Sequence, residues 1–309
     1  MRAVFFGTPH IAVPSLDALA EIAEVVAVVC QPDKPAGRGL AVAAPPAKAR
    51  ALELGLDVHQ PTKVRTPEFA SWLSGLRADV ALVIAYGRIL PKAVLDAPAK
   101  GCLNLHASLL PKYRGAAPIT WAIANGERET GVCLMQMDEG MDTGPVLSTH
   151  RLAIGDDETT DELGVRIGAL AAEVVRADVE RAVRGELAPS LQDHAAATMA
   201  RILEKEDGRI DWTKPARAVH DHARAMTSWP GAFTTLGGKL FKVLATKVED
   251  ELAHDAAPGT IVRAAKGNAI VACGAGALRI VRGQLEGKKA LTAAELVGGR
   301  TLALGARLG

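Results

Sequence analysis

Residues 1–30 read MRAVFFGTPHIAVPSLDALAEIAEVVAVVC, a segment with two apolar runs on either side of a helical pattern. Apolar runs at residues 3–7 and 25–30 are typical of buried strands, and the apolar spacing over 15–23 predicts a helix between them. Further strand-like runs lie at 80–85, 102–106 and 131–137, with helical patterns at 47–54, 67–76 and 118–125. This alternation predicts an α/β fold with a doubly wound, mostly parallel sheet.

The carboxyl ends of the predicted strands mark the edge at which such a sheet binds its ligands. Residues 7–9, 86–91 and 106–115 lie at that edge. Residues 156–184 then predict a long amphipathic helix that closes the first domain.

A second domain is expected after this helix. Residues 187–200 are polar and lack a regular pattern, as a linker does, and residues 216–226 predict a helix. A small β-barrel is predicted from short alternating segments at 239–248, 260–265, 269–272 and 277–281. We therefore expect a first domain over 1–186, a linker over 187–206 and a barrel domain over 207–309.

Length and composition exclude several classes of protein. The chain has 309 residues, 49% of them hydrophobic, which suits about two domains with cores of their own. Its apolar runs fall far short of the roughly 20 residues that a membrane span needs, so we expect a cytoplasmic protein without membrane contact. The cysteines form no CxxC pair and are expected to be buried, reduced thiols rather than metal ligands: Cys30, Cys102, Cys133 and Cys273.

The formal net charge of +1 hides an uneven distribution. Residues 205–309 carry 16 Lys and Arg against 10 Asp and Glu, whereas residues 1–204 carry 20 against 25. A basic second domain suits contact with nucleic acid, and Lys239, Lys242 and Lys247 on one predicted strand are candidate contacts. Random scatter of surface charge explains the excess equally well.

Two segments at the ligand-binding edge narrow the chemistry. The turn Gly7-Thr8-Pro9-His10 lacks the glycines of a dinucleotide-binding fingerprint, which argues against a nicotinamide enzyme. Residues 31–40 combine prolines and glycines with Lys34 and Arg38, so they predict either a loop that holds positive charge over this edge or an ordinary solvated loop.

The densest group of polar side chains is Asn104-Leu-His106 at the end of a predicted strand. Strand alternation places Asn104 and His106 on one face, where an amide and an imidazole can converge on one carbonyl oxygen. A purely structural histidine is the alternative.

A second polar group, Asp138-Glu-Gly-Met-Asp142-Thr-Gly144, follows the strand predicted at 131–137. If the two strands are adjacent and parallel, Asp142 comes close to His106, orients its ring and favours its cationic form. A simple turn is the other reading of this segment.

These motifs resemble the signature of the 10-formyltetrahydrofolate-dependent formyltransferases. The resemblance rests on Asn104-Leu-His106, on Ser108-Leu-Leu-Pro111-Lys-Tyr-Arg-Gly115 and on Met137-Asp-Glu-Gly-Met-Asp142-Thr-Gly144. It extends over almost the whole chain, towards the members of that family that act on methionyl-tRNA, through Phe6-Gly-Thr-Pro9, residues 31–39 and 85–91, Ile210-Asp-Trp212 and Trp229-Pro-Gly231.

The resemblance implies a Rossmann-like formyltransferase domain followed by an OB-like barrel that helps to hold tRNA. It implies 10-formyltetrahydrofolate as the formyl donor, no metal, and initiator methionyl-tRNA as the partner of a monomeric enzyme. It assigns catalysis to Asn104, His106 and Asp142, here called the trio. It assigns the folate site to Ser108, Leu109, Leu110, Pro111, Tyr86, Gly87, Arg88, Ile89 and Leu90.

The resemblance also places Arg38 in the loop that enters the acceptor stem of the tRNA. The chain departs from the family in this loop, because Leu40-Ala41 stand where a basic pair is usual, and also at Ser228, where proline is usual. The first departure bears on how the loop grips RNA.

The implied reaction is direct acyl transfer without an enzyme nucleophile. Ser108 lacks the sharp elbow of a hydrolase serine, which argues against serine-hydrolase chemistry. The alternatives left open are a formyltransferase acting on an amino-sugar nucleotide and a non-catalytic tRNA-binding protein with this fold.

Overall fold

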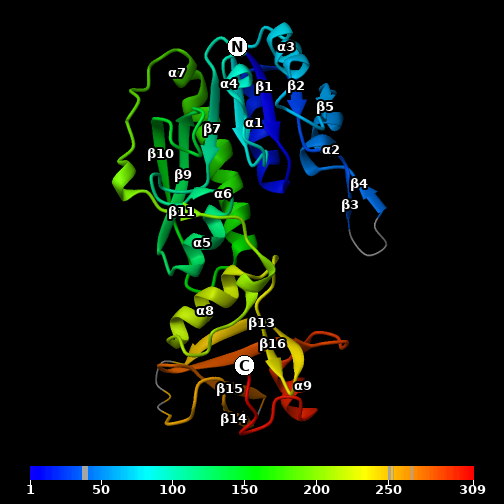
Figure 1. Ribbon diagram of the computed structural model, residues 1–309, viewed down its shortest axis with the longest axis vertical. Coiled ribbons are helices and arrows are strands. Elements are labelled where there is room, and N and C mark those ends of the chain that lie inside the picture. The colour runs from blue at the N-terminus through cyan, green and yellow to red at the C-terminus, as the bar shows by residue number, and fades with distance from the viewer. Residues whose placement is uncertain (37–40, 250–251, 253, 266) are drawn as a thin grey trace. The chain divides into compact units, whose positions relative to one another are not determined.

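Figure 1 shows the computed structural model, which describes residues 1–36, 41–249, 252, 254–265 and 267–309. Contacts along the backbone divide the chain into two units. Unit 1 consists of Met1–Pro118, Glu129–Ala153 and Gly164–Arg201, and unit 2 consists of Ile119–Arg128, Ile154–Leu163 and Ile202–Gly309. The sequence led us to expect continuous segments, whereas residues 119–128 and 154–163 group with the C-terminal unit.

Unit 1 is built on a sheet with the strand order β10-β9-β7-β6-β1-β2-β5. Its strands are β1 (Arg2–Gly7), β2 (Glu24–Val29), β5 (Val58–His59), β6 (Val80–Ile84), β7 (Cys102–His106), β9 (Glu129–Gln136) and β10 (Val146–Ala153). The strands from β7 to β5 pair in parallel, which confirms the doubly wound prediction.

The strand predicted at 131–137 runs in the direction opposite to the one expected. It forms β9, which is antiparallel to its neighbour β7, with His106 opposite Cys133. The connection from β7 to β9 contains α5 (Pro118–Ala124) and brings the chain to the edge where β7 ends, so β9 runs back along β7. The expectation that adjacent parallel strands bring Asp142 to His106 was therefore wrong about the direction of the strand, because β9 is antiparallel to β7.

Helices cover both faces of the sheet in unit 1. On one face, apolar side chains of β1, β2, β6 and β7 pack against α3 (Pro67–Gly75) and α4 (Lys92–Leu95). On the other, α1 (Val13–Ile22) and α2 (Pro46–Glu53) contact β2. The short strands β3 (Lys34–Ala36) and β4 (Ala41–Ala43) pair with each other.

The helix predicted at 156–184 is shorter and is interrupted. It forms α6 (Thr160–Val174), a π-helical turn (Val175–Val179) and α7 (Glu180–Val183). It begins at Thr160 because Thr159 and Glu162 exchange hydrogen bonds in a capping box, with Glu162 N donating to Thr159 Oγ1 and Thr159 N donating to Glu162 Oε2.

Unit 2 is an antiparallel barrel. Its strand order is β12-β13-β16-β15-β14, with β17 beside β16. The strands are β12 (Phe233–Leu236), β13 (Lys239–Glu249), β14 (Ile261–Ala265), β15 (Asn268–Ala272), β16 (Ala277–Leu285) and β17 (Leu291–Thr292). Bridges from Leu236 to Leu308 and from Thr260 to Arg307 link both edges to the last residues of the chain, which closes the sheet.

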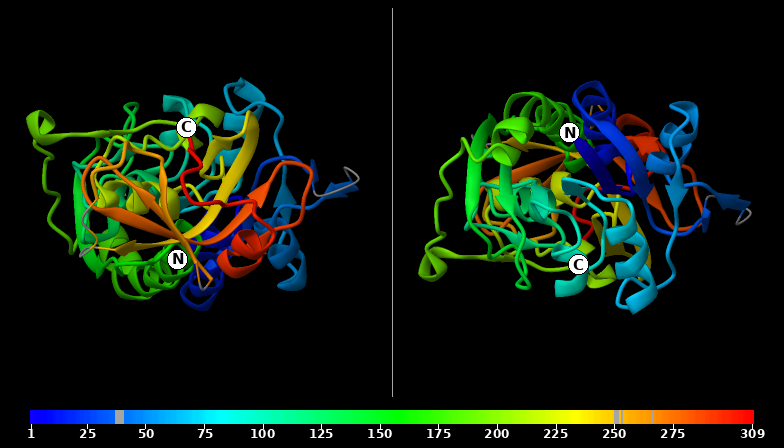
Figure 2. Two further views of the ribbon diagram at one scale, coloured as in Figure 1. Left: turned by 90° about the horizontal axis from the view of Figure 1, so that it is seen from below. Right: turned by 90° about the horizontal axis from the view of Figure 1, so that it is seen from above.

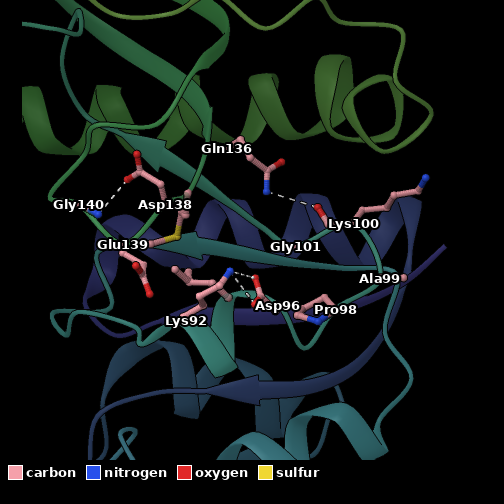
Figure 3. A pocket seen from close by; sticks show the side chains of 12 residues that line it. Lys92, Asp96, Pro98, Ala99, Lys100, Gly101, Gln136, Asp138, Glu139 and Gly140 are labelled. Carbon is pink, nitrogen blue, oxygen red and sulfur yellow. Dashed lines mark hydrogen bonds and ion pairs between the residues drawn. The ribbon is translucent and has the colours of Figure 1, made fainter. Parts of the chain in front are cut away.

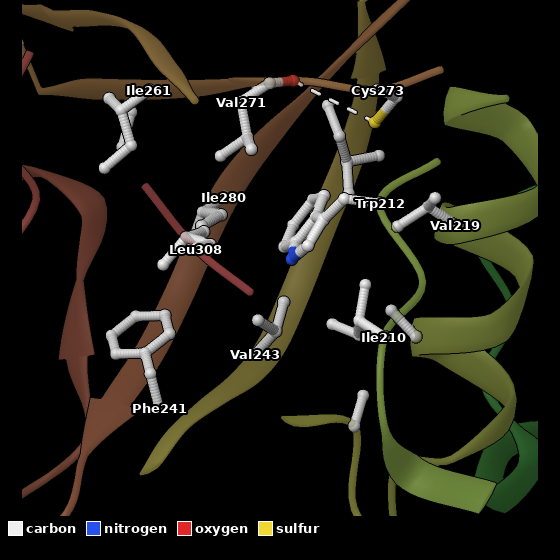
Figure 4. Packing of buried hydrophobic residues seen from close by; sticks show 14 of the residues in the cluster. Ile210, Trp212, Val219, Phe241, Val243, Ile261, Val271, Cys273, Ile280 and Leu308 are labelled. Atoms are coloured by element: carbon white, nitrogen blue, oxygen red, sulfur yellow. Dashed lines mark hydrogen bonds between the residues drawn. The ribbon is translucent and has the colours of Figure 1, made fainter. Parts of the chain in front are cut away.

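The barrel interior holds the core of unit 2. Trp212, Phe241 and Leu308 lie within it, and α8 (Ala216–Ala225) packs Val219 against it (Figure 4). In the left view of Figure 2, the strands of unit 2 run in different directions across one another. The helix α9 (Ala293–Gly298), which the sequence did not predict, adds Leu296.

Residues 187–201 belong to unit 1, although the sequence resembled a linker. Ser190 forms a bridge with Val146, and β11 (Met199–Ala200) pairs with β8 (Arg114–Gly115). Figure 1 shows this yellow-green segment running past β10 and back to β11. Its contacts lie beside the polar cluster described next.

Two sequence expectations concern burial and the membrane. The cysteines are buried as predicted, and burial raises the pKa of Cys30 to about 11 and that of Cys102 to about 12.

Among the described residues, no helix combines the length and the apolar character that a membrane crossing requires.

Candidate functional site

Strand β7 positions Asn104 and His106. Cys102 packs into the core beneath α4, and the alternation of the strand sets Asn104 and His106 on the same face, beyond that core. Both side chains are buried, with 9% and 5% of their surface exposed. A buried amide and a buried imidazole at a strand end need polar partners.

Asp142 supplies those partners from the loop that follows β9. Asn104 Nδ2 donates to Asp142 Oδ1 at 3.3 Å, and the backbone N–H of Gly115 donates to Asp142 Oδ2 at 2.8 Å. His106 Nδ1 lies 3.6 Å from Asp142 Oδ2. The structure thus brings together the three side chains that the sequence singled out, through a loop that folds back along the sheet.

The remaining nitrogen of His106 fixes the orientation of the ring. Nε2 lies 2.8 Å from the carbonyl oxygen of Tyr113, an acceptor without a proton of its own, so Nε2 must carry the proton of that bond. Nδ1 is therefore the nitrogen that faces Asp142.

The segment after β7 is also held by local bonds. Ser108 is fully buried, and its hydroxyl donates to the carbonyl of Lys112 at 2.6 Å. Leu109, Leu110 and Pro111 are half-buried, and the Leu110–Pro111 peptide bond is cis. The serine side chain is engaged with the backbone, which agrees with the argument against a hydrolase nucleophile.

Tyr86 follows β6 and directs its side chain into the core. It is 2% exposed, its ring meets Phe6 edge to face with centroids 5.2 Å apart, and burial raises its pKa to about 12. Only the backbone of Tyr86 is therefore available to a ligand at the sheet edge. Of the residues that follow, Gly87 and Ile89 are exposed and Leu90 is buried.

A polar network that the sequence did not reveal ties this turn to its surroundings. Gln31 Nε2 donates to the carbonyl of Tyr86 at 3.1 Å, and its Oε1 accepts from Arg88 Nε at 3.1 Å. Thr8 donates to the same carbonyl at 3.3 Å. The contacts cross 55 to 78 residues of sequence, which local patterns do not report.

The residues expected to contact RNA differ in their surroundings. Lys239 and Lys242 are exposed on β13. Lys247 instead lies 2.5 Å from Asp157 Oδ2, and this hydrogen bond lowers the pKa of Asp157. Arg38 lies outside the described residues.

Gln192 is a further residue beside the trio that the sequence gave no reason to choose. It lies in the polar stretch that resembled a linker, and its side chain donates to the backbone carbonyls of Asp142 and Gly144. No local periodicity marks it.

A pocket of about 730 Å³ has none of the trio in its lining (Figure 3). Residues 92–101 and 136–140 contribute its lining, where Lys92 pairs with Asp96 and Gln136 Nε2 donates to Lys100 O. In the part of the chain that the structure describes, no group of three or more His, Cys, Asp or Glu residues could hold a metal ion.

Two family patterns match the chain. The formyl transferase pattern covers residues 1–177, and the pattern of the formyl transferase C-terminal domain covers residues 202–301. The chain is 68% identical over 310 residues to the methionyl-tRNA formyltransferase of Sorangium cellulosum, with 100% of both proteins covered. It is 51% identical over 306 residues to that of Myxococcus xanthus, with 99% of this chain and 97% of the relative covered.

Solved structures share the fold at low identity. An N-formyltransferase from Helicobacter canadensis, in complex with folinic acid and dTDP-3-aminofucose, matches with a TM-score of 0.70 and 18% identity, covering 90% of this chain and 98% of that one. A methionyl-tRNA formyltransferase from Clostridium thermocellum matches with a TM-score of 0.56 and 16% identity, covering 82% and 95%. These likenesses support the predicted fold class, an α/β domain followed by an OB-like barrel.

Proposed function

The chain belongs to the formyl transferase family, and we propose that it transfers the formyl group of 10-formyltetrahydrofolate to the α-amino group of initiator methionyl-tRNA. The observation that carries this proposal is identity over the full length of relatives that bear the name methionyl-tRNA formyltransferase. The contacts among the trio support it, because they gather the groups that acyl transfer needs.

The proposed reaction is a direct exchange of one C–N bond for another. The neutral amine attacks the formyl carbon, which forms the new C–N bond and places negative charge on the formyl oxygen. The bond from that carbon to N10 of the folate then breaks, the amine loses one proton and N10 gains one. The products are N-formylmethionyl-tRNA and tetrahydrofolate.

Asn104 and His106 are proposed to stabilise the negative oxygen. The amide of Asn104 has two N–H groups, of which one points to Asp142, so the second can serve the oxygen. Because His106 Nε2 already donates to Tyr113 O, the ring reaches the oxygen through Nδ1, which donates only when both ring nitrogens carry a proton. Loss of one such donor typically slows a reaction by about 10²–10³.

Asp142 is proposed to move the proton. Its carboxylate orients Asn104 and faces His106 Nδ1 at 3.6 Å, a separation that leaves the pair open to a third polar group. It accepts the proton of the attacking amine, directly or through water, and the proton then passes to N10.

We propose separate binding residues for the folate and for the tRNA. Residues 108–111 and 86–90 border the folate in unit 1. Lys239 and Lys242 on β13 meet phosphates of the tRNA, with Lys247 as a weaker contact because it pairs with Asp157. Arg38 is proposed to contact the acceptor stem. We further propose that the protein acts as a monomer in the cytoplasm, where methionyl-tRNA is used.

The decisive experiment compares two acceptors under single-turnover conditions. Methionyl-tRNA and an amino-sugar nucleotide are each offered with 10-formyltetrahydrofolate. We expect rapid formylation of methionyl-tRNA and negligible transfer to the sugar. The reverse preference contradicts the proposal in favour of a sugar enzyme, and tRNA binding without transfer to either acceptor indicates a non-catalytic protein.

A further inference from the structure

We propose that Gln192 is a positioning residue for formyl transfer. Its side chain accepts hydrogen bonds from Arg114 and holds the turn at residues 142–144, so that the Asp142 carboxylate stays within the trio. This inference rests on the function proposed above and adds a residue to that reaction.

The side-chain amide of Gln192 joins the turn by two hydrogen bonds. Nε2 donates to the carbonyl of Asp142 at 2.9 Å and to that of Gly144 at 2.7 Å. Gln192 is 9% exposed, so little water can replace these bonds. Both N–H groups of the amide are thereby used on the backbone of the loop that carries Asp142.

Arg114 determines which way that amide points. Its Nε and Nη2 both donate to Gln192 Oε1, at 3.1 and 2.8 Å, and its Nη1 lies 3.2 Å from His194 Nδ1. A guanidinium offers donors and no acceptor, so the amide oxygen must face Arg114 and the amide nitrogen must face the turn. Arg114 is 5% exposed, which makes this arrangement costly to rearrange.

The turn needs such support because of its backbone. Asp142 has φ of 53°, in the left-handed region that residues with a side chain adopt at a cost. Backbone held in this way persists where surrounding contacts determine it. One of the two carbonyls that Gln192 binds is that of Asp142 itself, so the bond acts directly on the strained residue.

The segment that carries Gln192 is tied to unit 1 on both sides. Before it, Ser190 exchanges backbone hydrogen bonds with Val146, at 2.8 and 2.9 Å. After it, Thr198 accepts at its carbonyl from the N–H of Arg114 and, at its hydroxyl, from the N–H of Tyr113, both at 2.9 Å. The segment from Ser190 to Thr198 thus contacts both the turn that carries Asp142 and the backbone around Tyr113, whose carbonyl binds His106.

Gln192→Glu tests the inference with almost no change in shape. The carboxylate still accepts from Arg114, but it has no N–H groups to donate. One of its oxygens instead faces the carbonyl oxygens of Asp142 and Gly144, which repel it. Because misplacement by about 1 Å can cost about 10² in rate, we expect kcat to fall roughly 10- to 100-fold, with KM for both substrates changed less than about twofold. If Gln192→Glu does not fold, Gln192→Met removes the donors at similar volume and carries the same expectation.

Gln136→Glu is the matched control. The amide nitrogen of Gln136 also donates to two backbone carbonyls in unit 1, those of Lys100 at 3.4 Å and Cys102 at 3.2 Å. It therefore reports the general cost of this substitution on stability. We expect its kcat to stay within about twofold of wild type.

A double mutant separates positioning from a merely structural role. If Gln192 acts through Asp142, then Gln192→Glu costs little further rate in an Asp142→Asn background. If the two losses multiply, Gln192 acts independently of Asp142 and the inference is overturned.

Crystal structures of Gln192→Glu and Gln136→Glu keep this test distinct from that of the proposed function. A wild-type protein that transfers no formyl group refutes the function, while the structures still report on the turn. We expect Gln192→Glu to lose the left-handed φ of Asp142 or its bond from Gly115, and Gln136→Glu to keep both. Asp142 unmoved in Gln192→Glu overturns the inference, whatever happens to kcat.

Discussion

Replacing Asp142 with asparagine removes the charge and leaves the shape. The carboxylate accepts at both oxygens, from Asn104 Nδ2 at 3.3 Å and from Gly115 N at 2.8 Å. An amide has one oxygen, so its NH₂ group faces either the N–H of Gly115 or the amide of Asn104, and a partly buried mismatch of this kind costs about 1–3 kcal/mol unless Asn104 turns its amide over. The variant also loses proton transfer, typically worth about 10²–10⁴ in rate. We therefore expect kcat to fall by about 10² or more, with modest changes in KM.

The assay is single-turnover formylation with saturating methionyl-tRNA and 10-formyltetrahydrofolate, with thermal unfolding as the check on folding. Asp142→Ala, Asn104→Ala and His106→Ala should each reduce the rate to a similar extent. Because the three groups act on one transition state, their double mutants should lose far less than the product of the single losses. A rate for folded Asp142→Asn within tenfold of wild type contradicts the proposed role of Asp142, and losses that simply multiply contradict the joint action of the trio.

Other expectations concern RNA binding, pH and thiol reactivity. Lys242→Gln should flatten the slope of log K for tRNA binding against log salt concentration by about 0.7–0.9. Lys247→Gln should change that slope little, because Lys247 pairs with Asp157. Equal slopes for the two variants would contradict this difference between the two lysines. Arg38→Ala should weaken use of methionyl-tRNA and leave folate affinity unchanged, as separate titrations would show. Burial lowers the pKa of His220, so its contribution to stability should be lost as pH falls below about 6.5, and urea unfolding at pH 7.5 and 5.5 should show a smaller acid loss in His220→Gln than in wild type. Cys102, with a pKa raised to about 12, should resist alkylation at pH 8 in the native protein and react after unfolding, as mass spectrometry would report.

The central strands of the parallel sheet could be predicted because they are buried on both faces, whereas the two-residue edge strand β5 is only partly buried and was not predicted. Residues 3–7 and 80–85 are continuous apolar runs, and they correspond to β1 and β6, whose residues are almost all buried. Strand β10 (Val146–Ala153) alternates between partly exposed and exposed residues and includes His150 and Arg151, so its sequence did not mark it as a strand. The barrel strands β13, β14, β15 and β16 were predicted because glycine-rich turns separate alternating segments there, whereas the short strands β12 and β17 were not predicted.

The candidate site was predictable to the extent that it depends on local order. Asn104 and His106 follow from the alternation of one strand. Asp142 was chosen from its motif and its family resemblance, but the route by which it arrives depends on the direction of β9, which no local pattern reports. Gln192 contacts Asp142 across 50 residues and Arg114 across 78, so its place became visible only in three dimensions.

Detection of the reaction product tests the proposed formyl transfer itself. Purified protein is incubated with 10-formyltetrahydrofolate and initiator methionyl-tRNA, the aminoacyl ester is hydrolysed, and the released amino acid is identified by mass spectrometry. We expect N-formylmethionine in an amount equal to the tetrahydrofolate formed, and almost none in the same time with Asp142→Asn. Unmodified methionine from the wild-type protein, with folate binding intact, would contradict it.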